Sequence, residues 1–119
     1  MIKKLFFLSF FACSLSFLHG EKSHAVFVVG THHYSPPKSM PMLASEIERL
    51  GFKTTVINPE WDPEKDKRGL PGLEVLKKAD LAVFYTRFLK IDDQQLVHIT
   101  DYLKLGKPVV GFRTSTHGF

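Results

Sequence analysis

The sequence predicts an α/β protein built on an open parallel sheet. Four short apolar runs alternate with helical patterns: residues 25–30 (AVFVVG), 54–58 (TTVIN), 81–86 (LAVFYT) and 108–112 (PVVGF). Each run is apolar throughout and does not alternate with polar residues, which is typical of strands buried on both faces. Because strand and helix alternate along the chain, the connections should be right-handed crossovers, with strand order 2-1-3-4.

The segment after the first strand predicts a helix. Its apolar face consists of four residues spaced by three or four positions: Met40, Leu43, Ile47 and Leu50. Ser39 is suited to the N-cap, Pro41 to the first turn and Gly51 to the end of the helix.

A second helix is predicted between the last two strands. Asp92 stands three residues before Gln95, the spacing of a capping box, and Gly106 with Pro108 marks the end. Its apolar stripe is Leu96, Ile99 and Leu103. A shorter helix is expected over residues 73–79, and the segment 59–72 is expected to be a mobile surface loop or rim at the sheet edge.

The amino-terminal segment has the layout of a secretory signal. Lys3 and Lys4 precede an apolar run over residues 5–18, which is too short for a confident membrane span. We therefore expect a signal peptide over residues 1–20, one domain over 21–119, and a periplasmic or extracellular location. Cys13, the only cysteine, falls inside this signal. A lipid anchor there is the alternative, disfavoured because Phe10 stands where lipoprotein signals usually have leucine.

Composition and motifs exclude several function classes. Without Lys3 and Lys4 the formal net charge falls from +4 to +2, and no basic stripe with interleaved aromatic residues argues for nucleic acid. Neither G-x-G-x-x-G nor G-x-x-x-x-G-K-[ST] occurs, so dinucleotide and P-loop chemistry lose their main support and no cofactor is expected. Once the signal is removed, no thiol remains for a disulfide or a cysteine nucleophile.

Ligands of open parallel sheets bind beyond the carboxyl ends of the strands, so the loops over residues 31–39, 86–89 and 113–117 are the candidate sites. In the first loop, His32 and His33 are candidates for a general base or a metal ligand, next to Tyr34. The alternative is that one imidazole binds backbone in the turn and the other faces solvent.

His117 in the last loop strengthens the functional interpretation. Neighbouring strands lie about 4.8 Å apart, so the bases of the first and last loops should be only about 10 Å apart. His117 can then approach His32 or His33. A metal is disfavoured, because no HExxH motif, cysteine cluster or carboxylate at ligand spacing accompanies the histidines.

Arg87 ends the third predicted strand. Its guanidinium is suited to fork onto a carboxylate, a phosphate or a pair of sugar hydroxyls. The alternative is a salt bridge to Asp92 or Asp93 at the start of the next helix.

The closing turn contains Ser115, a possible nucleophile. A hydrolase elbow needs Gly two residues before and two after the serine, and here those positions are Arg113 and His117, so a serine hydrolase is disfavoured. Thr114, Ser115 and Thr116 are better interpreted as hydroxyl and backbone donors for an anionic or polyhydroxyl ligand.

Three stretches, "VFVVGTHHYSPPKSMPMLASEIERLGFKTTVIN", "LKKADLAVFYTRF" and "GKPVVGFRTSTHGF", resemble the N-terminal part of a ThuA-like (trehalose utilisation) domain. The resemblance implies the flavodoxin-like three-layer sandwich of class I glutamine amidotransferases and a role in sugar metabolism. It places Arg113 where amidotransferases have their nucleophilic cysteine, so glutamine hydrolysis is excluded. Because domains of this family continue past this turn, it also implies a sheet truncated after its fourth strand.

The leading hypothesis is therefore an exported protein that acts on or binds a carbohydrate. The expected catalytic residues, with a histidine transferring the proton, are His32, His33 and His117. The expected substrate-binding residues, with the arginines orienting hydroxyls or a carboxylate, are Tyr34, Arg87, Arg113, Thr114 and Ser115. The alternatives are a non-catalytic module that binds a glycan or a protein, and a truncated fragment without function.

Overall fold

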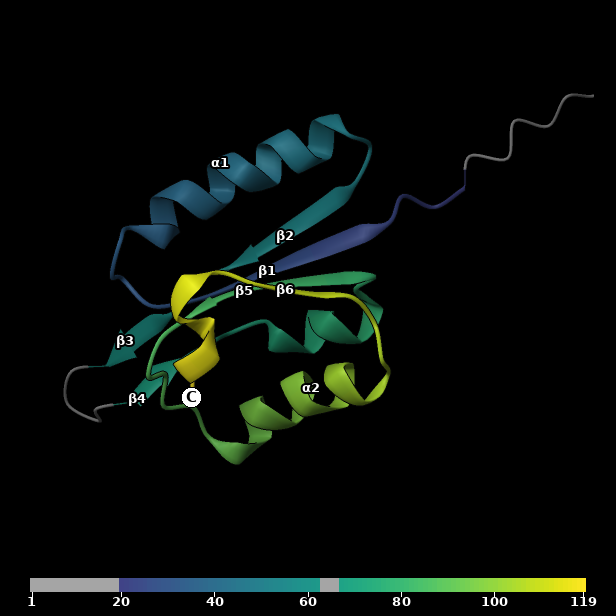
Figure 1. Ribbon diagram of the computed structural model, residues 1–119. Helices are drawn as coiled ribbons and strands as arrows, with labels where there is room; N and C mark the ends of the chain where they lie inside the picture. The colour runs from purple at the N-terminus through teal and green to yellow at the C-terminus, as the bar shows by residue number, and fades with distance from the viewer. Residues whose placement is uncertain (1–19, 63–66) are drawn as a thin grey trace, which may run out of the picture.

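The computed structural model describes residues 20–62 and 67–119. The predicted signal peptide, apart from Gly20, and Cys13 lie outside the described residues. Four parallel strands form the main sheet in the order β2-β1-β5-β6, which confirms the predicted order 2-1-3-4 (Figure 1). The strands are β1 (His24–Gly30), β2 (Lys53–Ile57), β5 (Leu81–Thr86) and β6 (Val109–Gly111).

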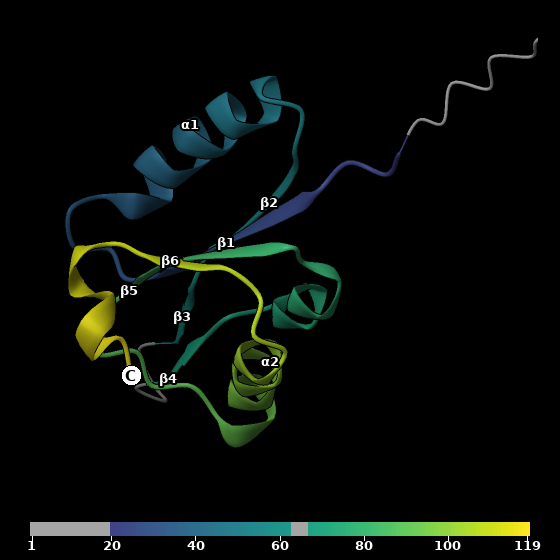
Figure 2. The same cartoon turned by 45° about the vertical axis from the view of Figure 1, so that its right-hand side comes forward.

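Helices cover both faces of this sheet, as in a flavodoxin-like fold. Helix α1 (Pro36–Arg49) lies on one face, whereas the 3-10 helix η1 (Leu73–Lys78) and helix α2 (Asp93–Lys104) lie on the other (Figures 1 and 2). A second 3-10 helix, η2 (Arg113–His117), follows β6 at the carboxyl edge of the sheet. The predicted fold class is therefore confirmed.

Strand β1 is buried along its whole length and divides the core into two halves. The half under α1 is built from Ala25, Phe27, Val29, Met40, Ala44, Val83 and Tyr85. The half under η1 and α2 includes Val26, Val28, Ile57, Leu73, Leu76, Ala82, Phe84, Ile99 and Tyr102. Alternate residues of one strand contribute to opposite halves, because successive side chains of a strand point to opposite faces.

Helix α1 begins earlier than the sequence predicted. Pro36 occupies the first turn, where a missing backbone N–H has no consequence, and Ser35 is the N-cap without a side-chain cap hydrogen bond. The predicted cap Ser39 and the first-turn assignment of Pro41 are therefore wrong, since both residues lie inside the helix. Leu50, predicted to belong to the apolar face, lies beyond the last turn and is 74% exposed.

The predicted N-cap of helix α2, Asp92, is confirmed, whereas its predicted apolar face is wrong at Leu103. The Asp92 carboxylate accepts a hydrogen bond from the Gln95 N–H at 2.8 Å. Leu103 is half-exposed, whereas Tyr102 is buried and its hydroxyl donates to the Pro108 carbonyl at 2.8 Å. A tyrosine can be buried in this way because its ring is apolar and its hydroxyl reaches a backbone acceptor.

The segment predicted as a loop over residues 59–72 contains secondary structure. Strands β3 (Glu60–Asp62) and β4 (Lys67–Gly69) pair in antiparallel fashion. Leu70 then enters the core, and its N–H donates to the Gln95 side-chain carbonyl at 3.2 Å. The hairpin is therefore anchored to helix α2 at its downstream end.

His24 is a buried titratable group at the start of β1. Its backbone N–H donates to the Asp80 carboxylate at 2.8 Å, and its Nε2 lies 2.9 Å from the Thr55 hydroxyl. Burial lowers the pKa of His24 below its ordinary value of 6.5, the nearby Lys53 charge lowers it further, and Asp80 opposes the shift.

We expect His24 to make the fold less stable in mild acid. Between its lowered folded pKa and 6.5, the unfolded chain binds the proton more readily than the folded chain, so the free energy of unfolding falls as the pH drops through this window. Urea unfolding at several pH values should show a shallower decline for His24→Gln than for the unmodified protein. Parallel curves for the two proteins would contradict this assignment.

Candidate functional site

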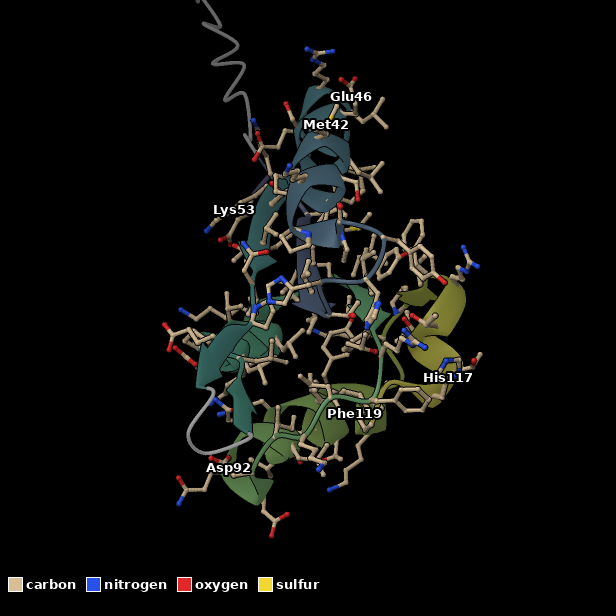
Figure 3. All side chains as sticks on the ribbon, turned by 90° about the vertical axis from the view of Figure 1, so that its left-hand side faces the viewer. Met42, Glu46, Lys53, Asp92, His117 and Phe119 are labelled. Carbon is tan, nitrogen blue, oxygen red and sulfur yellow. The ribbon has the colours of Figure 1, made fainter. Side chains whose placement is uncertain are left out.

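The carboxyl edge of the sheet brings together the loops that follow β1, β5 and β6. The last two are joined by backbone hydrogen bonds: Phe88 N–H donates to His117 O at 3.0 Å, and Leu89 N–H donates to Gly118 O at 2.7 Å. Figure 3 shows His117 on η2 and Phe119 between η2 and α2. The predicted convergence of loops at this edge is therefore present, and two of them form one connected layer.

Arg113 and Tyr34 join the first loop to the last. The Arg113 guanidinium carbon lies 4.2 Å from the centre of the Tyr34 ring, within the range of a cation–π contact. Since β5 lies between β1 and β6, this contact passes over the end of β5. Both residues were predicted to bind substrate, and the structure places them side by side.

The same loops contain all the non-glycine residues with a positive φ in the described part of the chain. They are Tyr34 (φ 68°), Ser35 (55°), Phe88 (44°) and Arg113 (34°). Such left-handed backbone is sterically unfavourable for a residue with a side chain, by about 1 kcal/mol or more each. Strain of this kind gathers at functional sites more often than elsewhere, and here it holds three large side chains at one edge of the sheet.

Phe88 lies between two of the predicted site residues. Its ring centre is 4.9 Å from that of His117 and 5.4 Å from the guanidinium carbon of Arg87. Among the described residues Arg87 forms no ion pair with Asp92 or Asp93, and its buried Nε has no hydrogen-bond partner. The salt bridge that was the alternative role of Arg87 is thus not formed, and its Nε is enclosed by protein without a hydrogen-bond partner. Sequence reasoning did not select Phe88, although its place between Arg87 and the next helix was a usable signal.

His32, His33 and His117 were predicted to lie near one another, but His117 is not in contact with the other two. The His117 Nδ1 lies 3.2 Å from the Thr116 hydroxyl, and the His33 backbone N–H donates to the Thr31 hydroxyl at 3.1 Å. His32 is exposed. Over residues 20–62 and 67–119, no hydrogen bond or ring contact joins His117 to His32 or His33. His117 therefore makes no direct contact with either imidazole of the first loop in this arrangement.

Thr114 and Ser115 have their hydroxyls bound to backbone. The Thr114 hydroxyl donates to the Thr86 carbonyl at 2.9 Å. The Ser115 Oγ accepts the Thr86 N–H at 3.2 Å and lies 2.9 Å from the carbonyls of Phe84 and Phe112. These hydroxyls therefore attach η2 to β5. The sequence predicted them as donors to a ligand, but in the structure they are bound to backbone groups.

Ser115→Ala is expected to lower stability. Removing the hydroxyl leaves the buried Thr86 N–H without an acceptor, which typically reduces the free energy of unfolding by about 1–3 kcal/mol. Chemical denaturation should show this loss, with Thr116→Ala as the matched control, since the Thr116 side chain is exposed. Equal stability of the two variants would show that the Ser115 bonds are not structural.

The charge of the three loops has one sign. Residues 31–39, 86–91 and 112–119 contain no Asp or Glu, whereas they contain three arginine or lysine side chains besides Arg113: Lys38, Arg87 and Lys90. Within the described ranges no group of three or more His, Cys, Asp or Glu residues is arranged to hold a metal ion. These three loops therefore offer donors and positive charge, whereas Glu60 follows β2 at the same edge and Asp92 and Asp93 begin helix α2.

An open apolar hollow lies beside this edge, between α2, β6 and η2. Its volume is about 380 Å³, and its apolar lining includes Phe84, Ile99, Leu103, Val109, Phe112 and Phe119. Val109 and Val110 are each 45% exposed. The last strand is therefore not covered on both faces as its apolar run alone suggests, whereas the exposed edge fits the expected truncation of the sheet after its fourth strand.

No protein-family model, curated protein or solved structure matches this chain. Among the described residues, no helix combines the length and the apolar character needed to cross a membrane.

Proposed function

We propose that this chain is an exported carbohydrate-binding protein whose carboxyl-edge loops bind a small anionic sugar. The observation that carries the proposal is the composition of these loops: two arginines, each against an exposed aromatic ring, stand in loops without a carboxylate. The resemblance of the sequence to ThuA-like domains supports a sugar ligand, and the signal-like amino terminus supports export.

Arg113 and Arg87 supply the charge recognition. A guanidinium that stacks on a ring keeps the N–H groups of its edge available, so Arg113 can hold a carboxylate or phosphate while resting on Tyr34. Arg87 lies on the loop after β5, with its guanidinium carbon 5.4 Å from the ring centre of the adjacent Phe88. Two arginines on separate loops can contact two sides of one anionic group.

The aromatic rings supply the contact with the sugar ring. Phe88 is 63% exposed and Tyr34 is 57% exposed, and both have a positive φ. A flat apolar ring face packs well against the C–H groups of a pyranose, and burying it on binding is favourable. Exposed rings beside cations therefore suit a ligand with one apolar face and one charged group.

Binding without turnover is favoured over catalysis. The Ser115 and Thr114 hydroxyls are occupied by backbone, and Arg113 stands at the strand-to-helix turn where related sheets place a nucleophile. Proton transfer by His117 is the second candidate. The Thr116 hydroxyl lies next to its Nδ1, and no described residue bonds its Nε2, which is thus available to a ligand.

The test is a calorimetric or NMR titration of the full chain with glucuronate, with glucose as the neutral control of matched shape. We expect saturable binding of glucuronate, at least about tenfold tighter than that of glucose, because charge-assisted hydrogen bonds are the stronger ones. Long incubation with trehalose and with a glucuronide should yield no product. Equal affinities for glucuronate and glucose would contradict charge recognition, and product formation would favour the catalytic candidate.

A further inference from the structure

Thr86 lies where the three candidate loops meet. It is the last residue of β5, the strand between β1 and β6 (Figure 1), and it is only 1% exposed. It pairs with Gly30, the last residue of β1, and it immediately precedes Arg87. The loop that carries Tyr34 and the turn that carries Arg113 therefore leave the sheet on either side of Thr86.

The backbone of Thr86 holds the turn that contains Arg113. Its N–H donates to the Ser115 Oγ at 3.2 Å, and its carbonyl accepts the Thr114 hydroxyl at 2.9 Å. Thr114 and Ser115 are the two residues that follow Arg113, so both bonds act next to the guanidinium-bearing position. The start of η2 therefore cannot shift along β5 without breaking them.

The side chain of Thr86 holds the end of β1 on the other side. A Cβ at Gly30 would lie 2.8 Å from Thr86 Cγ2, so the threonine methyl group occupies the space that glycine leaves open. The next residue, Thr31, is fully buried, and its hydroxyl accepts the His33 N–H at 3.1 Å. A continuous set of contacts therefore runs from Thr86 to His33, the residue before Tyr34.

The contact between Arg113 and Tyr34 depends on loops that are held in place. Both residues have a positive φ, which is sterically unfavourable for a residue with a side chain. Both are exposed, and a cation–π contact at an exposed site is one of the weaker interactions in proteins. It does not by itself offset the steric penalty of two left-handed residues. The 4.2 Å contact therefore requires support from the strand beneath it.

We propose that Thr86 is a positioning residue, which holds Arg113 over the Tyr34 ring and so sets the geometry of the ligand site without touching the ligand. Its hydroxyl is buried and has no hydrogen-bond partner among the described residues, so the side chain acts through its shape. Its two branches lie against Gly30 and Gly118, where an added Cβ would overlap them. A β-branched side chain suits this role because its rotamers are restricted. Where it concerns binding, the inference rests on the proposed function.

The first measurement is the NMR spectrum of the full chain without ligand. Protons that lie over an aromatic ring resonate upfield, so the Arg113 side-chain signals report on the contact with Tyr34. In Thr86→Ala we expect these signals to move toward their positions in Tyr34→Leu, which lacks the ring. Thr86→Val keeps both branches and should leave them in place. So should Ile99→Val, which removes one buried methyl group under α2 and is the matched control for a general loss of stability.

The second measurement is the glucuronate titration of the same variants. Thr86→Ala should bind glucuronate at least about threefold more weakly, whereas Thr86→Val and Ile99→Val should stay within about twofold of the unmodified protein. If Thr86→Ala does not fold, Thr86→Ser, which loses only the methyl group facing Gly30, takes its place.

Three results would overturn the proposal: Arg113 signals that do not move in Thr86→Ala, an unchanged affinity of that variant for glucuronate, or the same change in Ile99→Val. An equal loss of affinity in Thr86→Val and Thr86→Ala would also contradict it, because the hydroxyl and not the shape would then matter. If the Arg113 signals move as expected but the unmodified protein does not bind glucuronate, Thr86 positions the pair and the proposed function alone is wrong.

Discussion

Arg113→Met is expected to weaken glucuronate binding by about 10–100-fold. One charge-assisted hydrogen-bonding group is worth about 1.5–3 kcal/mol, and about 1.4 kcal/mol corresponds to tenfold in affinity. Methionine keeps much of the length and apolar character of the side chain, so the change reports on the guanidinium. The affinity for glucose should change little, because its ring has no charged group for Arg113 to recognise. The measurement is the same titration, made on both proteins at equal ionic strength.

Two controls separate recognition from general charge. Arg113→Lys keeps the positive charge but loses the planar fork, so an intermediate loss of affinity is expected. Lys77→Met removes one positive charge from η1, which precedes β5 at the opposite edge of the sheet, and should leave glucuronate affinity within about twofold. If Arg113→Met binds glucuronate as tightly as the unmodified protein, the proposed site is wrong.

Gly30→Ala is expected to lower the free energy of unfolding by about 1–3 kcal/mol. Gly30 ends the central strand β1, and a Cβ added there would lie 2.8 Å from Leu89 Cδ2 and 2.8 Å from Thr86 Cγ2. Both neighbours are buried, so neither can move aside without disturbing the packing. Urea unfolding of the purified variants measures the effect.

Gly111→Ala is the matched control, because a Cβ at this position would lie 3.5 Å from Ser115 Cβ, an ordinary contact. We expect it to be neutral or slightly stabilising, since alanine restricts the unfolded chain. Adding Thr86→Ser to Gly30→Ala removes the Cγ2 that clashes and should restore part of the lost stability. A Gly30→Ala protein as stable as the unmodified one would show that the β1 end is not tightly packed.

The sheet could be predicted from sequence because its signal is local. Runs of apolar residues mark the strands of the main sheet, and one helical pattern lies between each run and the next, which favours parallel strands joined by crossovers. Burial at the edges could not be predicted in the same way. Val110 belongs to a run as apolar as the others, so the run alone does not show its exposure, which follows from the position of β6 at the end of the strand order.

The location of the candidate site was predictable, but the direction of its side chains was not. The rule that ligands bind at the carboxyl ends of parallel strands selected this edge, where the structure brings the three loops together. The Ser115 bond to Thr86 joins residues 29 positions apart, and the stacking of Arg113 on Tyr34 joins two loops. Such pairings depend on how the loops fold over β5, which no short pattern records. The β3–β4 hairpin was missed for a related reason, since its strands are only three residues long.

The left-handed residues at the carboxyl edge have a consequence for how this protein tolerates change. Glycine adopts positive φ without steric penalty, so glycine at Tyr34, Phe88 or Arg113 relieves local strain even as it deletes the side chain. A randomised library selected only for resistance to heat or protease should drift toward glycine and asparagine at these positions. Selection for ligand retention should pull the same positions back toward aromatic residues and arginine. Positions where the two selections favour different residues would be those at which a side chain needed for ligand binding lowers the stability of the fold.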